Sequence, residues 1–362
     1  MHMVRYLFLI WLFTASASAC SVPVFRYALE HWPADPFQVT VFHRGTLSDE
    51  QKRLVHEDAL ANARVQTINL DDAPAPEMLD LWRQQKTDAL PWLVVRFPRF
   101  TGITASVISG PLTEMAPGLF DSPVRRQIIQ QLAEGQSAVW VLLESGDRAK
   151  DDAAAALVET RLKYLMSVMT LPKLDAQDIA NGLVSIAEED LRLEFAVLRL
   201  SRRDPAERVL VQMLRKSESD LESVMEPMVF PIFGRGRALY ALVGAGIRQE
   251  TIDEAAGFLV GKCSCQVKEQ NPGVDLLLKA DWNHLIKTSP EVARDLPTVA
   301  ELNKFAPVSV TTASQPTGMP AGVATPAKKT SVLILVLLYA VSPLISALAV
   351  IIAWNRWKRR RL

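Results

Sequence analysis

The chain has 362 residues, and its 40 acidic side chains balance its 40 basic ones, so the formal net charge is zero. This balance argues against a nucleic-acid-binding protein, which usually presents a large basic surface. The three cysteines are too few for a disulfide-rich scaffold, and the length allows two domains of ordinary size.

Residues 1–19 have the features of a secretory signal peptide. Arg5 supplies a positive charge, residues 6–13 form an apolar run, and a series of small residues follows. The apolar run is too short to cross a bilayer core of about 30 Å. The Ala-Ser-Ala sequence at 17–19 matches the small-x-small cleavage pattern, so we expect cleavage and an extracytoplasmic mature chain.

Cys20 follows the predicted cleavage site directly. A cysteine after small residues resembles the lipobox of bacterial lipoproteins, in which the thiol is acylated. Ala17 stands where a lipobox usually has leucine, so we favour ordinary cleavage. Lipidation of Cys20 stays open as an alternative, as does a disulfide with Cys263 or Cys265, because exported proteins oxidise.

Residues 30–135 are predicted to form a first alternation of strands and helices. The segment 37–42 alternates and is rich in strand-forming residues, which predicts a strand. Ser48 is a suitable N-cap for the helix after it. Two more strands are predicted at 65–70 and 92–95, and a closing helix at 124–132.

Residues 136–268 are predicted to repeat this order. The repeat is supported by one shared spacing: Pro91 precedes Phe97 by six residues, as Pro227 precedes Phe233. Strands are predicted at 138–143, 193–200 and 228–230, helices at 151–169, 175–189 and 249–260, and a hairpin through 234–243. Residues 269–304 form a C-terminal extension of this region.

The end of the chain reads as a membrane anchor. Residues 305–330 are rich in Pro, Thr and Ala, which is typical of an extended linker. Residues 331–354 contain no charged side chain, and as a helix they would span about 36 Å. The basic tail 355–362 follows, and the positive-inside rule predicts that it is cytoplasmic.

Several features of the second copy are similar to the C-terminal half of thioredoxins. These are the strand from Pro227 to Phe233, the turn at 234–236, the Val-Gly pair at 243–244 and the last helix. The strand after Pro91 resembles the same cis-proline strand. The resemblance spans residues 36–265 as two tandem copies. It implies an α/β fold of two thioredoxin-like domains, each a central mixed sheet flanked by helices, with cis-prolines at Pro91 and Pro227.

Thioredoxins react through a Cys-x-x-Cys motif at the start of their first helix, where the helix dipole lowers the thiol pKa. The matching segments here are 45–49 and 145–150, and neither contains a cysteine. Disulfide exchange at these places is therefore impossible. We expect two degenerate copies that bind rather than catalyse and that carry no cofactor.

Cys263 and Cys265 are separated by one residue after the last predicted helix. Three interpretations are open: a structural pair, a soft-metal site for Cu(I), or a redox dithiol.

We therefore expect a membrane-anchored extracytoplasmic binding or scaffold protein. Its expected partners are the membrane and another envelope protein, with no nucleic acid. One alternative is an envelope thiol-redox or copper-handling protein acting through Cys263 and Cys265. A second alternative is an accessory subunit of a membrane complex.

Overall fold

The computed structural model describes residues 20–56, 59–263 and 266–288. The predicted signal peptide, linker, membrane helix and basic tail lie outside these residues. Within the described part, no helix is both long and apolar enough to cross a membrane.

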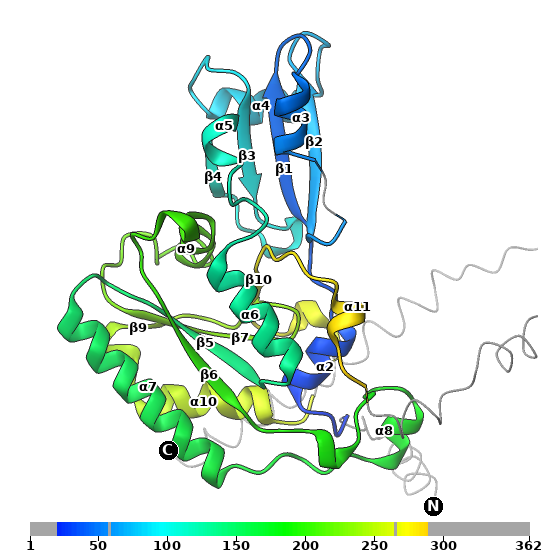
Figure 1. Cartoon of the computed structure of the whole chain (residues 1–362), viewed down its shortest axis with the longest axis vertical. Helices are drawn as coiled ribbons and strands as arrows, with labels where there is room; N and C mark the ends of the chain where they lie inside the picture. Colours follow the sequence, from blue (N-terminus) through cyan, green and yellow to red (C-terminus); the bar gives the residue numbers. More distant parts are fainter. Residues whose placement is uncertain (1–19, 57–58, 264–265, 289–362) are drawn as a thin grey trace, which may run out of the picture. The chain divides into compact units, whose positions relative to one another are not determined.

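The first sheet has four strands in the order β2-β1-β3-β4 (Figure 1). β1 runs parallel to β2, with Phe37 opposite Ala63, and antiparallel to β3, which in turn pairs antiparallel with β4. The strands are β1 (Phe37–His43), β2 (Ala63–Asn69), β3 (Trp92–Arg96) and β4 (Ser106–Pro111), and the helices are α3 (Asp49–Leu54), α4 (Pro76–Gln84) and α5 (Leu112–Met115).

Side-chain alternation gives this sheet two apolar faces. Phe37, Val39 and Val41 of β1 point into the main core. Phe42 points the other way, into a small cluster with Val94 and α4. This period of two is what a strand imposes on its side chains, and it explains why the 37–42 pattern predicted β1 correctly.

The second sheet has six strands in the order β10-β8-β7-β5-β6, with β9 also paired to β7. β5 is parallel to β6 and antiparallel to β7, so the central connectivity of the first sheet recurs. Every residue of β5 is buried, as expected of a strand covered on both faces. The strands are β5 (Ala138–Leu143), β6 (Phe195–Leu200), β7 (Met228–Phe233), β8 (Arg237–Ala238), β9 (Leu242–Val243) and β10 (Val274–Asp275).

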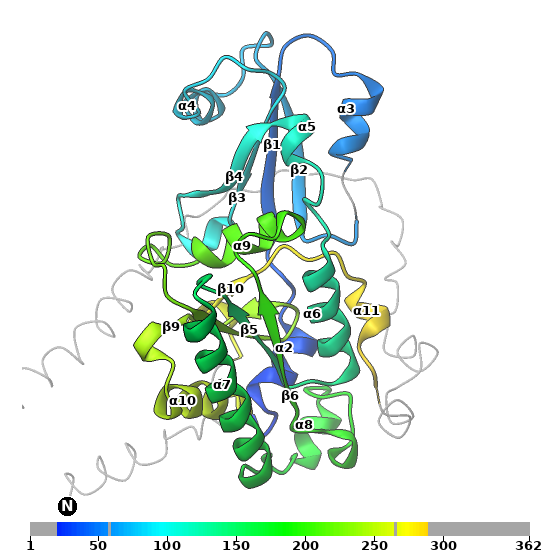
Figure 2. The ribbon, with the colours of Figure 1, turned by 60° about the vertical axis from the view of Figure 1, so that its left-hand side comes forward.

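Helices cover both faces of the second sheet (Figure 2). α2 (Val24–His31), α7 (Arg148–Val168) and α10 (Gln249–Val260) pack mainly around Trp140 and Leu142. α6 (Pro123–Glu134) and α9 (Arg208–Arg215) pack on the opposite side, around Val139 and Val141. The described part therefore contains two mixed sheets flanked by helices.

Several elements differ from the sequence predictions. α6 was predicted to close the first copy, yet it contacts β5 and β6 of the second sheet. One apolar cluster contains side chains from both sheets, so the two predicted copies share a core. The helix predicted over 175–189 is only α8 (Ala176–Ala180), and β10 and α11 (Trp282–Leu285) come from the extension.

The Leu90–Pro91 peptide bond is cis, as the resemblance implied. The prediction of a cis bond between Glu226 and Pro227 is wrong, because Leu90–Pro91 is the only cis bond among the described residues. Trans is the lower-energy isomer for most X–Pro bonds. Here the Glu226 carbonyl accepts a hydrogen bond from Arg202, and the Pro227 carbonyl accepts one from the amide of Gly244 at 2.9 Å, so both flanking carbonyls have partners in the trans arrangement.

Candidate functional site

The turn before α7 is where the resemblance places a reactive cysteine in the second copy. A buried carboxylate fills it instead. Asp151 accepts from the Ser145 amide at 2.7 Å and from its hydroxyl at 2.8 Å, and it also accepts from the Gly146 amide at 3.0 Å. Asp147 caps the helix by accepting from the amides of residues 149 and 150. The donors of this turn are therefore satisfied within the chain, and the turn carries no thiol.

The turn before α3, beside the first sheet, is also held by a carboxylate. Asp71 accepts from the Gly45 amide at 3.1 Å and pairs with Arg44 at 2.6 Å. The hydrogen bond from Gly45, helped by Arg44, holds the pKa of Asp71 below its usual value. Ser48 and Gln51 form a reciprocal capping box, as the sequence indicated for Ser48. This turn, too, is a structural one.

Cys20 and Cys263 are brought together, although 243 positions separate them in the sequence. They are 3% and 1% exposed, and both belong to one apolar cluster. Val22 accepts from the Cys263 amide at 2.9 Å, so the two segments run side by side. Burial raises the pKa of the Cys20 thiol, and burial followed by the charges of both cysteines raises that of Tyr27.

Cys265 lies outside the described residues, so its side chain is not placed. Among the residues that are described, no group of three or more His, Cys, Asp or Glu side chains is arranged to hold a metal ion. The pair Cys263 and Cys265, predicted as a site for Cu(I), stays a prediction.

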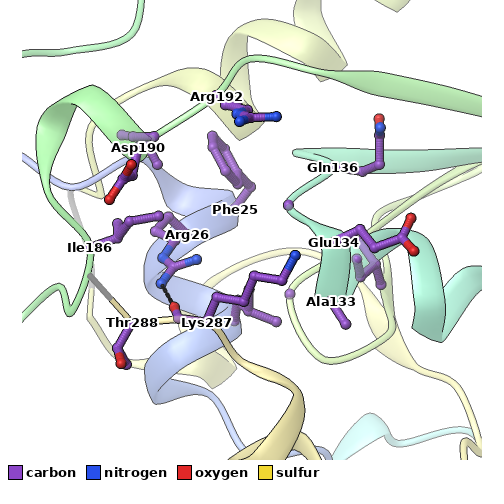
Figure 3. A pocket seen from close by; sticks show the side chains of 15 residues that line it. Phe25, Arg26, Ala133, Glu134, Gln136, Ile186, Asp190, Arg192, Lys287 and Thr288 are labelled. Atoms are coloured by element: carbon purple, nitrogen blue, oxygen red, sulfur yellow. Dashed lines mark hydrogen bonds between the residues drawn. The ribbon is translucent and has the colours of Figure 1, made fainter. Parts of the chain in front are cut away.

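A cavity of about 260 Å³ lies between α2, the end of α6 and the segment 186–192 (Figure 3). Figure 3 shows Phe25 on one side of it, and on the other side Glu134, the last residue of α6, and Gln136, which follows α6. Its apolar lining consists of Phe25, Leu29, Leu132, Ala133, Ile186 and Leu191. Its charged lining consists of Arg26, Glu134, Asp190, Arg192 and Lys287. We call this cavity the α2 pocket.

An ion pair inside the fold fixes one wall of the α2 pocket. Arg26 is buried and pairs with Glu30 one helical turn later at 2.5 Å. The same guanidinium donates to the Lys287 carbonyl at 2.9 Å, and Glu30 accepts from the Ser185 amide at 2.8 Å. These contacts connect α2 to two segments that are distant in the sequence. The pocket wall therefore depends on long-range hydrogen bonds rather than on one helix.

The lining of the α2 pocket combines apolar side chains with carboxylates, an amine and guanidinium groups. Apolar side chains next to charges of both signs suit an amphipathic ligand such as a peptide segment. The sequence prediction missed this pocket because it left residues 24–31 unassigned. Phe25 and Leu29 at i and i+4 were the helical signal that pointed to α2.

The chain matches no protein-family model, no curated protein and no solved structure. Its function therefore has to be inferred from its own geometry.

Proposed function

We propose that this chain is a membrane-anchored, extracytoplasmic binding protein with two degenerate thioredoxin-like copies. The recurring connectivity of the two sheets supports the duplication. In the first sheet β1 is parallel to β2 and antiparallel to β3, which is antiparallel to β4. In the second sheet β5 is parallel to β6 and antiparallel to β7, which is antiparallel to β9. The predicted signal peptide and the apolar segment 331–354 support the location. The α2 pocket is the proposed binding site, and another envelope protein is the proposed ligand.

One observation carries this proposal. In both copies, the turn that precedes the first helix of the sheet is held by a carboxylate of this chain, Asp71 or Asp151. A thioredoxin uses the equivalent turn to present a thiolate. Because a structural carboxylate replaces the reactive thiol in both turns, we infer that the two copies act by binding other molecules at their surfaces and pockets.

Photo-crosslinking in intact cells tests the binding site. A photoreactive amino acid is placed at Ala133, which lines the α2 pocket, or at Ala156, an exposed residue of α7 that does not line it. We expect an adduct of higher mass from position 133 and none from 156. No adduct from 133, or the same adduct from both positions, contradicts the proposal.

The location is tested separately with reporters fused after Leu362. A reporter that works only in the cytoplasm should be active there. Activity only of a reporter that requires the opposite side contradicts the proposed orientation.

A redox or copper-handling function through Cys263 and Cys265 is the rival, and the fold adds Cys20 as a further thiol in the apolar cluster that contains Cys263. A disulfide reductase assay and a Cu(I) titration of the thiols distinguish this rival from the proposed binding function. We expect neither exchange activity above background nor stoichiometric Cu(I) binding. Activity that is lost in the double variant Cys263→Ser, Cys265→Ser supports the rival.

A further inference from the structure

A second cavity, of about 360 Å³, lies where β5 and β6 end. Because these two strands are parallel, their carboxyl ends meet at one edge of the sheet, which is where open α/β sheets usually bind ligands. The cavity shares no lining residue with the α2 pocket. It is lined by Ser145, Gly146, Ser201, Arg202, Arg203, Arg215 and Met225, which include three arginines and no acidic residue.

Arg202 forms the fixed part of this cavity. Its guanidinium donates to the carbonyls of Glu144 and Val224, both at 2.7 Å, and to that of Glu226. It therefore fastens the end of β5 to the segment before β7. Burial lowers the pKa of Arg202, and the nearby charge of Arg215 lowers it further. The two guanidinium groups thus repel each other across the cavity.

Arg203 and Arg215 have hydrogen-bond donors to spare. Among the described residues, no hydrogen bond or ion pair is formed by the exposed guanidinium of Arg203, which lies over Gly146 with Nη2 3.9 Å from where a Cβ would stand. Arg215 donates to the Glu222 carbonyl through Nη2, but its Nε is buried without a partner. A buried donor without an acceptor is costly.

The carboxylates near the cavity are engaged elsewhere. Asp151 lies under the turn and accepts from Ser145 and Gly146. Glu226 pairs with Lys150 at 2.7 Å, and Glu144 pairs with Arg199 at 2.7 Å. The positive charge of the cavity is therefore not matched by a carboxylate that lines it.

We propose that Arg203 and Arg215 bind a phosphate-class oxyanion in this cavity. Guanidinium groups match the oxygens of phosphate in geometry and charge, and paired forks bind them more strongly than neutral donors do. Arg202 positions the two loops, and Ser201 offers a hydroxyl at the same edge. Met225 is 65% exposed beside the arginines, which suits an organic group attached to the phosphate. This site goes beyond the proposed function and does not depend on the α2 pocket.

Calorimetric titration of the full chain with inorganic phosphate, in a nonionic detergent and a chloride buffer, tests the proposal. We expect saturable binding at one site. Arg203→Gln and Arg215→Gln should each weaken it about tenfold, since each removes a charged donor. The matched control is Arg148→Gln, which removes an equally charged side chain from the exposed first turn of α7, outside the cavity. This control should bind phosphate within about twofold of the unaltered chain.

A thermal melt of each variant confirms that it is folded, and Arg203→Lys, which keeps the charge but loses the fork, should bind at an intermediate level. Titration with glycerol 3-phosphate distinguishes the sources of the oxyanion. Tighter binding than that of inorganic phosphate supports an organic phosphate, and equal binding supports the free ion. The proposal is overturned if the unaltered chain shows no saturable binding, or if Arg148→Gln weakens binding as much as the two cavity variants.

Discussion

The buried carboxylate of Asp151 accepts two hydrogen bonds from Ser145, one from the amide at 2.7 Å and one from the hydroxyl at 2.8 Å. The same carboxylate holds the Gly146 amide, so a single side chain orders the turn that leads into α7. This turn also borders the arginine-lined cavity. Asp151 is therefore expected to matter for stability although it is not expected to react.

Replacing Asp151 by Asn tests this role. The amide keeps the size of the side chain but turns one acceptor into a donor facing other donors, which should cost about 2 kcal/mol. For a folded unit of this size the melting temperature should fall by roughly 4–8 °C. Asp152→Asn, at an exposed neighbouring position, should cost much less. Equal losses at both positions would show that the turn is not held in this way.

Asp275 ties the C-terminal extension to the second sheet. Its buried carboxylate accepts from Lys268, from Arg237 at 3.1 Å and from the Asp35 amide at 2.6 Å. Asp275→Asn removes the carboxylate that Arg237 and Lys268 share and leaves Lys268 paired with Asp35 at 3.0 Å, which should cost about 3 kcal/mol and lower the melting temperature by roughly 10 °C. Asp80→Asn breaks an exposed ion pair with Arg83 and should leave the melting temperature unchanged. Asp275→Asn and Asp80→Asn remove the same charge, so equal losses of stability at the two positions would contradict this role of Asp275.

The ion pair between Arg161 and Asp253 connects α7 to α10 and makes a pH-dependent contribution to the free energy of unfolding. Arg161 donates through Nε at 2.7 Å and through Nη2 at 2.5 Å. The hydrogen bond from Arg161 holds the pKa of Asp253 below its ordinary value. In the unfolded chain this carboxyl protonates at about pH 3.9. The pair therefore stabilises the fold above that pH, and its contribution is lost as the pH falls through the lower folded pKa.

Arg161→Gln should lower the melting temperature at neutral pH, and the difference from the unaltered chain should shrink below about pH 4. Arg83→Gln serves as the control, because its ion pair with Asp80 is largely exposed. A deficit that is as large in strong acid as at neutral pH would mean that Arg161 acts through packing rather than through Asp253.

Thiol reactivity tests the placement of the cysteines. After reduction, Cys20 and Cys263 should react slowly with iodoacetamide in the folded chain and rapidly in concentrated urea. Both are buried, and burial raises the pKa of Cys20 so that less of the nucleophilic thiolate is present. A cysteine introduced by Phe100→Cys, at a position that is 81% exposed, gives the rate of an accessible thiol. Peptide mass spectrometry follows the alkylation of each cysteine. Equal alkylation rates at Cys20 and at position 100 would contradict the burial of Cys20.

The central strands were predictable because their signal is local. The alternation in β1 and the apolar runs of β5 and β7 follow from burial of one or both faces, which each strand shows in its own residues. The strand β10 was not predictable, since Val274 and Asp275 join the sheet only by pairing with Ala238 and Arg237. No periodicity is visible in a strand of two residues.

Both cavities escaped the sequence prediction for a similar reason. The α2 pocket combines α2 with residues from α6, from 186–192 and from 287–288. The arginine-lined cavity depends on Arg202, whose guanidinium binds carbonyls on both sides of it in the sequence, at Glu144 and Glu226. Arg202 and Arg203 in sequence look like ordinary solvated charges. Only the contact between distant segments shows that Arg202 is held by backbone carbonyls, while Arg203 is exposed beside it in the cavity lining.

Arg235 holds the C-terminal end of α2, and so one wall of the α2 pocket. It donates through Nε to the Leu29 carbonyl at 2.8 Å and through Nη2 to the Glu30 carbonyl at 2.9 Å. The last carbonyls of a helix have no partner within the helix, so these bonds act as a cap from the neighbouring turn. Gly234 lets α2 approach closely, since a Cβ there would stand only 2.8 Å from the Cβ of Ala28.

Arg235→Gln shortens this reach, so α2 should open locally while the rest of the fold stays closed. We expect hydrogen exchange of the amides in 24–31 to become about tenfold faster, which corresponds to losing roughly 1.4 kcal/mol of local stability. Exchange in α7 should not change. Arg248→Gln, at a well-exposed residue just before α10, is the control and should leave hydrogen exchange in both helices unchanged.

If α2 exchanges at the same rate in Arg235→Gln as in the unaltered chain, the Arg235 cap does not hold α2. If α7 accelerates equally, the variant has weakened the whole fold. Selective opening should also weaken the crosslink from position 133, because the pocket wall and the cap belong to the same helix.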